Sequence, residues 1–451
     1  MITRLIQFAL AQRVFILILA ALLSGMGWYA FQQIPIDAFP DVASTQVKII
    51  LKAPGMTPEE VENRVAVPIE TEMLGIPKQE MLRTTVKYGI VDITLTFNDG
   101  TDIYWARQQV NERLNGVLKD LPASVSGGLA PITTPLGEIF MFTIEGPLSL
   151  MEKRTLLDWT VRPQLRNIPG VADVNTLGGL VKSFEVIPDP VALAARKVSL
   201  QQLQDALESN NRNDGAGRLN SGEESLLVRS DGSIRSIDDV RAITIDQRGG
   251  VAVRIGDVAT VMIGQLTRYG SVTKDGKSEA VQGLILGMRG ANAQKVVEQV
   301  NQRLKLIEKT LPQGTTIKPF YDRGNLVERA VNTVTKALAE ATILVVILLY
   351  LFLGNVRSAL VVACILPLAA LGTFLLMRQF GLSANLMSLG GLAIAIGMLV
   401  DAAVVVVENI EAHSADKERP NFSKLHIIYR AVREVAVPVT AGMVVIMIVF
   451  L

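Results

Sequence analysis

Residues 389–409 read LGGLAIAIGMLVDAAVVVVEN, and this stretch indicates the fold class because it is an apolar span that contains an acid. Residues 389–407 are apolar apart from Asp401, which gives about the length that crosses a bilayer core as a helix. Glu408 follows two helical turns later, so both side chains share one helix face, about 10 Å apart along the axis. A carboxylate at mid-span costs roughly 2.5 to 3.5 kcal/mol on insertion scales. Asp401 therefore needs a structural or functional reason.

Two interpretations of this acidic pair remain open. In one, the acids form a structural ion pair with a basic residue of a neighbouring span. In the other, they bind and release protons in a transporter. No basic residue occurs within the other apolar runs of the chain, which favours proton binding. The small residues Ala402 and Ala403 beside Asp401 allow another helix to approach closely.

Other apolar runs indicate a multi-span membrane protein. They are residues 14–31, 342–353, 359–377 and 435–451. A cleaved signal peptide is disfavoured for the first run, because it lacks a small-x-small cleavage site and more spans follow. With the N-terminus in the cytoplasm, Arg357 and the basic segment 409–434, which includes Lys417 and Arg419, also lie there, as the positive-inside rule requires. The region from about 34 to 335 is then expected outside the cytoplasm.

The composition excludes several classes of protein. Among 451 residues, 44 Lys and Arg oppose 43 Asp and Glu, so the net charge of +1 argues against a protein that wraps nucleic acid. A single cysteine, Cys364, excludes an intramolecular disulfide and a multi-thiolate zinc site. Two histidines, His413 and His426, leave little room for histidine-based catalysis. No nucleophile–base pair or phosphate loop is spaced plausibly, so we expect no enzyme.

The long polar insertion alternates strand and helix signals. Strand-like residues 46–53, 81–88 and 91–97 and helix-like residues 57–74 and 102–121 give a β-α-β-β-α order. This order is typical of ferredoxin-like split βαβ units. The first helix has a clear start, because Thr57 caps it, Pro58 occupies its first turn and Glu60 completes a capping box.

A second unit of the same kind follows. Its expected strands are residues 139–144, 171–176 and 182–187, with a helix at 150–168. A strand at 280–288 and a helix at 292–311 come later in the chain. Between them, a helix at 199–211, a turn-rich stretch at 213–222 and several short strands predict a looser inserted module.

These features together resemble the resistance–nodulation–division (RND) exporters, and in detail their heavy-metal efflux branch. The matching motifs are IPIDAFPD at 34–41, DGTD at 99–102, WARQ at 105–108, RPQLRN at 162–167, YDR at 321–323, GNVRSAL at 354–360, SANLMSLGG at 383–391 and VDAAVVVVEN at 400–409. The resemblance covers essentially the whole chain and corresponds to the N-terminal half of the family layout, which has twelve spans.

The resemblance implies a fold and an assembly. The expected fold is an α-helical transmembrane bundle plus an α+β periplasmic domain, one half of the RND fold, with ferredoxin-like βαββαβ porter subdomains and an inserted docking subdomain. The implied membrane parts are a first transmembrane helix at 1–33 with a cytoplasmic N-terminus and transmembrane helices 2–5 at 334–451, the last truncated. Between them lie porter subdomain 1 at 34–135 and porter subdomain 2 at 136–178 with 274–333. A docking subdomain at 179–273 is inserted into porter subdomain 2. The family also implies a homotrimer in the lipid bilayer of the bacterial inner membrane, with a periplasmic adaptor and an outer-membrane channel as partners.

The resemblance further implies proton-driven export of heavy-metal cations, with no bound cofactor beyond the transported cation and protons. Asp401 and Glu408 would form the proton relay, and Glu138 resembles a metal ligand of the family. An oxygen ligand favours a divalent ion such as Co, Zn, Cd or Ni. The alternatives are a copper–silver exporter, since residues 395–397 read Ala-Ile-Gly as in that type, and a multidrug exporter, although Ala402 replaces the second aspartate of that branch. A lipid-sensing receptor module is least favoured, because it has no need of two acids in a span.

Overall fold

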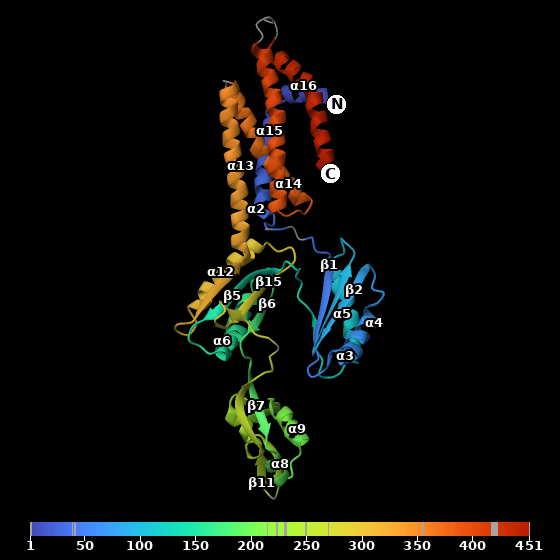
Figure 1. Ribbon diagram of the computed structural model, residues 1–451, viewed down its shortest axis with the longest axis vertical. Helices are drawn as coiled ribbons and strands as arrows, with labels where there is room; N and C mark the ends of the chain where they lie inside the picture. Colours follow the sequence, from blue (N-terminus) through green and yellow to red (C-terminus); the bar gives the residue numbers. More distant parts are fainter. Residues whose placement is uncertain are drawn as a thin grey trace.

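The computed structural model describes residues 2–37, 39, 42–213, 215–221, 224–229, 232–248, 250–268, 270–353, 356–415 and 423–450. Some positions discussed above lie outside the described residues: Ala38, Pro40, Asp41, Asp214, Gly222, Gly354, Asn355, Lys417, Arg419 and Leu451. Figure 1 shows an elongated molecule, with a helical bundle at one end, two α+β subdomains in the middle and a smaller lobe at the other end.

The first α+β subdomain has the ferredoxin-like βαββαβ order. Its elements are β1 (Thr45–Lys52), α3 (Pro58–Val61), η1 (Glu62–Ala66), α4 (Val67–Met73), β2 (Gln79–Lys87), β3 (Ile90–Phe97), α5 (Ile103–Val117) and β4 (Ser126–Leu129). The antiparallel sheet has the strand order β2-β3-β1-β4. The helices cover one face of this sheet and bury an apolar core against it (Figure 1).

Local signals begin this subdomain's first helix where the sequence predicts. Thr57 Oγ1 accepts a hydrogen bond from Glu60 N at 3.3 Å, and the Glu60 carboxylate accepts one from Thr57 N at 2.9 Å. The predicted capping box is therefore confirmed. Gly89 connects β2 to β3 with a φ of +66°, a conformation that favours glycine.

The second α+β subdomain repeats this topology. Its elements are β5 (Glu138–Glu145), α6 (Leu150–Leu156), η2 (Leu157–Val161), α7 (Arg162–Arg166), β6 (Val171–Gly178), β15 (Val281–Gly287), α12 (Ala293–Glu308) and β16 (Thr316–Asp322). The strand order is β16-β5-β15-β6, the same connectivity as in the first sheet. The helices again cover one face, over a core that includes Phe140 and Phe142.

The prediction that residues 182–187 continue the second sheet is wrong. This segment forms β7 (Lys182–Pro188), which pairs antiparallel with β12 (Ala259–Gln265) in the inserted lobe. Two glycines with positive φ, Gly178 and Gly179, precede the departure of the chain from the second sheet. The position of the third strand, between β5 and β6, goes instead to β15, and β16, a strand that the sequence did not predict, pairs with β5 on its other side.

The inserted lobe enters between β6 and β15 and has its own apolar core. Besides β7 and β12 it contains α8 (Pro190–Ala195), α9 (Leu200–Asn210), β8 (Gly215–Ser221), β9 (Glu224–Arg229), α10 (Ile237–Ala242), β10 (Thr244–Arg248), β11 (Val251–Arg254) and α11 (Ile255–Val258). The short strands β13 (Thr273–Lys274) and β14 (Ser278–Glu279) lead back to the second sheet. The stretch expected to be turn-rich, 213–222, is largely strand β8, paired with β9.

The helical bundle contains α2 (Arg13–Gln33), α13 (Arg323–Leu353), α14 (Val356–Gln379), α15 (Leu386–Ala415) and α16 (Lys424–Phe450). Among the described residues, α2, α14, α15 and α16 are long and apolar enough to cross a membrane. α13 follows β16 without a break and carries the remaining predicted run. One continuous helix thus leads from the second subdomain into the bundle (Figure 1).

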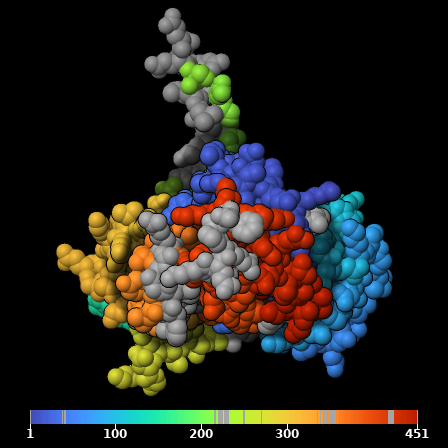
Figure 2. All heavy atoms as spheres, turned by 90° about the horizontal axis from the view of Figure 1, so that it is seen from above, coloured from blue at the N-terminus to red at the C-terminus, as the bar shows by residue number. Residues whose placement is uncertain are grey.

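The apolar run predicted at 14–31 lies within α2, but the residues before it form a further helix that the sequence did not predict. A separate helix, α1 (Ile2–Ala11), precedes α2, and the chain changes direction at Gln12. Gln7 Nε2 in α1 donates a hydrogen bond to the Tyr429 hydroxyl of α16 at 3.0 Å. Figure 2 looks onto this end of the bundle, where the blue N-terminal residues lie against red α16.

Candidate functional site

One face of α15 packs into the bundle. Its buried residues are Leu389, Leu392, Ile396 and Val400, which recur at helical spacing. They share an apolar cluster with residues of α14 that include Val362 and Leu366. This packing fixes which side of α15 is turned away from the bundle.

The predicted acids lie on the face of α15 that the bundle leaves open. Asp401 and Glu408 are both exposed, in line with Ile394 and Val405, which are 57% and 45% exposed. The expectation that the two acids share one face is therefore confirmed. Among the described residues, neither carboxylate forms a hydrogen bond or ion pair. A Cβ on Gly397 would meet no atom within 4 Å, so a further helix has room to approach here.

Polar contacts at the C-terminal end of α15 fix the orientation of this helix about its own axis. Asn409 Nδ2 donates to Ala431 O of α16 at 2.8 Å. His413 Nε2 lies 3.1 Å from the Glu434 carboxylate, also on α16. Ser358 Oγ of α14 donates to the Glu411 carboxylate. Sequence reasoning did not assign these residues, although polar side chains spaced along the end of an apolar helix were a visible signal.

A buried polar residue caps the N-terminal end of α15. Asn385, which is only 6% exposed, accepts hydrogen bonds from Met387 N and Ser388 N, both at 3.0 Å, through its side-chain oxygen. We call residues 383–385 the junction loop and residues 34–37 the junction linker. Ala384 N donates to Pro35 O at 3.0 Å, and Asp37 N donates to Ala384 O at 3.1 Å, so loop and linker form a short β-bridge.

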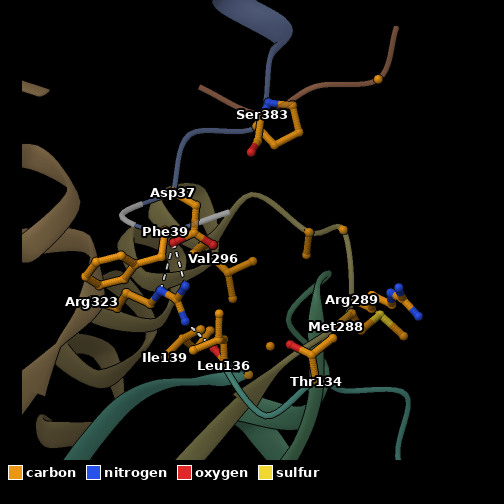
Figure 3. A pocket seen from close by; sticks show the side chains of 17 residues that line it. Asp37, Phe39, Thr134, Leu136, Ile139, Met288, Arg289, Val296, Arg323 and Ser383 are labelled. Atoms are coloured by element: carbon orange, nitrogen blue, oxygen red, sulfur yellow. Dashed lines mark hydrogen bonds and ion pairs between the residues drawn. The ribbon is translucent and has the colours of Figure 1, made fainter. Parts of the chain in front are cut away.

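A cavity of about 250 Å³, the junction pocket, lies where the bundle meets the second α+β subdomain (Figure 3). Arg323, the first residue of α13, points into it and is 6% exposed. Its Nε and Nη2 contact one Asp37 oxygen at 2.8 and 2.7 Å, and its Nη1 donates to Leu136 O. On another side, Arg289 donates to Ala43 O at 2.8 Å and to Thr45 Oγ1 at 3.2 Å. Asp37 and Arg323 lie in the motifs at 34–41 and 321–323, but neither motif predicted that the two side chains pair.

Glu138, the predicted metal ligand, begins β5 and is exposed. It pairs with Leu286 of β15, and Asp173 of β6 pairs with the same Leu286 from the other side. The two acids therefore flank one strand position of the second sheet. Asp173 is bound by Arg166 at 3.0 Å and Arg162 at 3.4 Å. No group of three or more His, Cys, Asp or Glu suited to a metal occurs in the described part of the chain, so Glu138 stays a prediction.

The open face of the second sheet also carries a strongly bonded acid. Glu145 at the end of β5 binds Lys274, and it binds Lys318 of β16 at 2.6 Å. The hydrogen bond from Lys274, followed by that from Lys318, lowers the pKa of Glu145 to about 2. Glu145 is therefore ionised at neutral pH, and both of its lysine partners form ion pairs with it. Among the described residues, Glu138 forms no such ion pair.

Comparison with known proteins gives consistent matches. The family model of the AcrB/AcrD/AcrF family matches residues 5–451. Protein HelA of Legionella pneumophila is 41% identical over 465 residues, which cover 100% of this chain and 44% of that protein. The cation efflux system protein CzcA of Alcaligenes sp. (strain CT14) is 40% identical, with the same coverage. The cation efflux system protein CusA of Escherichia coli (strain K12) is 38% identical over 413 residues, 91% of this chain and 39% of that one.

Solved structures agree with these matches. A crystal structure of a heavy metal efflux pump superposes with a TM-score of 0.84 at 36% identity, covering 98% of this chain and 44% of that one. A second crystal form of such a pump gives a TM-score of 0.85 and covers 43% of that chain. The expected fold class, an RND half with paired ferredoxin-like subdomains, is confirmed. The chain spans less than half the length of the relatives it matches.

Proposed function

The chain belongs to the AcrB/AcrD/AcrF family of RND exporters, and we propose on this premise that it forms part of a pump that exports heavy-metal cations in exchange for protons. The observation that carries the proposal is the open acidic face of α15. Two carboxylates stand on one side of an apolar helix, with neither bonded among the described residues. The heavy-metal efflux names of the relatives support the cargo.

In this pump, Asp401 binds a proton from outside the cytoplasm and Glu408 passes it inward. A bilayer or a packed helix bundle favours the neutral acid over the carboxylate, so the protonated state is the one that tolerates an apolar partner. Loss of the proton leaves a charge that needs a polar or cationic neighbour. The glycine and alanine residues on and beside this face suit a membrane helix from outside this chain, which would supply that neighbour. Alternation between the two states changes how α15 packs, and this is the driving step.

The cargo is a cation that carboxylate oxygen can bind. Glu138 is exposed at the start of β5, at the opposite end of the strand from the ion pairs of Glu145. A single carboxylate binds a transition metal weakly, so Glu138 acts with ligands from another part of the assembly. We favour a divalent ion, and a copper or silver cargo is the second candidate, because residues 395–397 have the form found in that type.

The assembly follows the family pattern. The pump is a homotrimer in the bacterial inner membrane, with the α+β subdomains in the periplasm and the inserted lobe farthest from the membrane. A periplasmic adaptor and an outer-membrane channel complete the route out of the cell. The length of the molecule supports this, since the lobe lies at the opposite end from the apolar helices (Figure 1).

The test is Asp401→Asn in the full-length transporter in proteoliposomes, with metal export and proton flux measured together. Asparagine keeps the shape of the acid and mimics its permanently protonated form, so export should stop while the protein still inserts and binds metal. Glu408→Gln should reduce export less, because its end of the helix is closer to water. Glu340→Gln serves as the matched control, since Glu340 lies on α13 in an exposed pair with Lys336. Export near the wild-type rate by Asp401→Asn would refute the proton role.

A metal-susceptibility panel in cells separates the two cargo candidates. Cells that express the full-length gene are grown with cobalt, zinc, cadmium, nickel, copper or silver salts. Resistance confined to the first four supports the divalent cargo. Resistance confined to copper and silver replaces it with the second candidate.

A further inference from the structure

The junction linker is one of the places where α15 is connected to the second α+β subdomain, through backbone hydrogen bonds and an ion pair. We propose that the junction linker, clamped between the junction loop and Arg323, transmits the movement of α15 to the second α+β subdomain, with Asp37 and Arg323 as the positioning pair. This inference rests on the proposed function, because it assigns the residues that couple the proton site to the export region.

The connection begins inside the bundle. Ile34, the first residue of the linker, is 2% exposed and lies in the same apolar cluster as the packing residues of α15. Ala384 belongs to this cluster too, and it is joined to Pro35 and Asp37 by two backbone hydrogen bonds. Asn385 caps the helix through Met387 N and Ser388 N. A tilt or shift of α15 therefore carries the junction loop and the linker with it, because tightly packed interiors transmit displacement.

The connection continues through the ion pair. Arg323 is the residue at which β16 ends and α13 begins, so it belongs to the second subdomain and the bundle at once. The same guanidinium donates to Leu136 O, two residues before Glu138 at the start of β5. A displacement of Asp37 thus reaches two neighbouring strands of the second sheet, β16 and β5, through one side chain (Figure 3).

The ion pair between Asp37 and Arg323 is expected to persist while the elements around it move. Separation from Asp37 would leave the buried Arg323 guanidinium without its charged partner, which is unfavourable, so the contact resists separation. The junction pocket of about 250 Å³ beside it gives the linker space to move without a clash. A firm contact next to open space is compatible with a rigid-body shift at this junction.

A second contact holds the other end of this connection. Arg289, in the turn after β15, holds Ala43 O and Thr45 Oγ1 where the chain enters β1. The chain from α2 to β1 is therefore held at both ends, by Arg323 near the bundle and by Arg289 near the first sheet. Displacement of the linker changes the angle between the two α+β subdomains, and such a change opens or closes the space between them.

The experiment compares variants of the full-length transporter in proteoliposomes and measures metal export, metal binding and metal-stimulated proton flux. Asp37→Asn should keep metal binding and lower both export and metal-stimulated proton flux by about 2- to 30-fold, the range for residues along a coupling network. Asp37→Glu keeps the charge and should restore most of both activities. Arg323→Lys, which keeps the charge and loses the fork of donors, should be impaired like Asp37→Asn. Glu279→Gln breaks the exposed pair with Arg268 and should change nothing.

A disulfide tests the same inference in a second way. In a Cys364→Ala background, Ile36→Cys with Ala384→Cys links the bridge partners, whose usual separation of about 5 Å suits a disulfide. Since linker and loop are proposed to move together, the oxidised protein should export at the wild-type rate. Loss of export that dithiothreitol reverses would show that they separate, and would overturn the inference. Wild-type export by both Asp37→Asn and Arg323→Lys would also overturn it, while an inactive Asp401→Asn would leave the proposed function standing.

Discussion

Gly27→Ala in α2 probes how closely the first span is packed in the bundle. Gly27 is buried against α14, and a Cβ there would lie 2.5 Å from Leu371 O and 2.7 Å from Leu371 C. These are backbone atoms of a helix, so no side chain can turn aside to make room. Ordinary contact at about 3.5 Å requires the two helices to separate by about 1 Å.

The expected cost follows from this overlap. Overpacking of a close-packed interior destabilises by about 1 to 3 kcal/mol. For domains of 150 to 250 residues this lowers the melting temperature by about 2 to 12 °C. The assay is thermal unfolding of the purified full-length protein in detergent, followed by its tryptophan fluorescence and by the loss of the monodisperse peak on size exclusion.

Gly25→Ala is the matched control two residues away in the same helix. A Cβ on Gly25 meets no atom within 4 Å, and alanine is the better helix former by about 1 kcal/mol. Its melting temperature should stay level or rise slightly. Equal melting temperatures for Gly27→Ala and Gly25→Ala would refute the close approach of α2 and α14.

Two further predictions concern the second α+β subdomain. Glu138→Ala should weaken divalent-metal binding to the full-length protein in calorimetric titration and leave its fold unchanged by circular dichroism; unchanged affinity removes Glu138 from the site. Because Lys274 and Lys318 lower the pKa of Glu145 to about 2 from an ordinary 4.5, its stabilising contribution is complete above pH 4.5 and is lost as the pH falls toward 2. Acid unfolding followed by circular dichroism should therefore show a shallower loss of stability between these pH values for Glu145→Gln, and parallel curves would contradict the pairing.

Periodicity and local capping determined much of this protein from the sequence alone. The apolar runs marked the bundle helices, because a bilayer-length helix needs about 20 apolar residues and little else. Thr57 and Glu60 marked a helix start, because a capping box is a contact between near neighbours in the chain. Asp401 and Glu408 could be placed on one face, because a helix returns to the same side every two turns. Each of these inferences depends on residues within a single continuous segment of the chain.

Strand partners and buried contacts over long distances were decided only by the tertiary structure. The segment at 182–187 has the pattern of a strand in either sheet, and its partner β12 lies far along the chain. β16 completes the second sheet beside β5 although Pro319 and Lys318 weaken its strand signal. Asp37 and Arg323 are 286 positions apart, and each is an ordinary charged residue next to an apolar run until folding buries Arg323 against Asp37. The open side of α15 was likewise settled by its neighbours, since the packing of Leu392 and Ile396 against α14 is what turns Asp401 outward. Contacts of this kind depend on how helices and strands that are distant in the sequence pack against one another. Local sequence patterns contain no information about that packing.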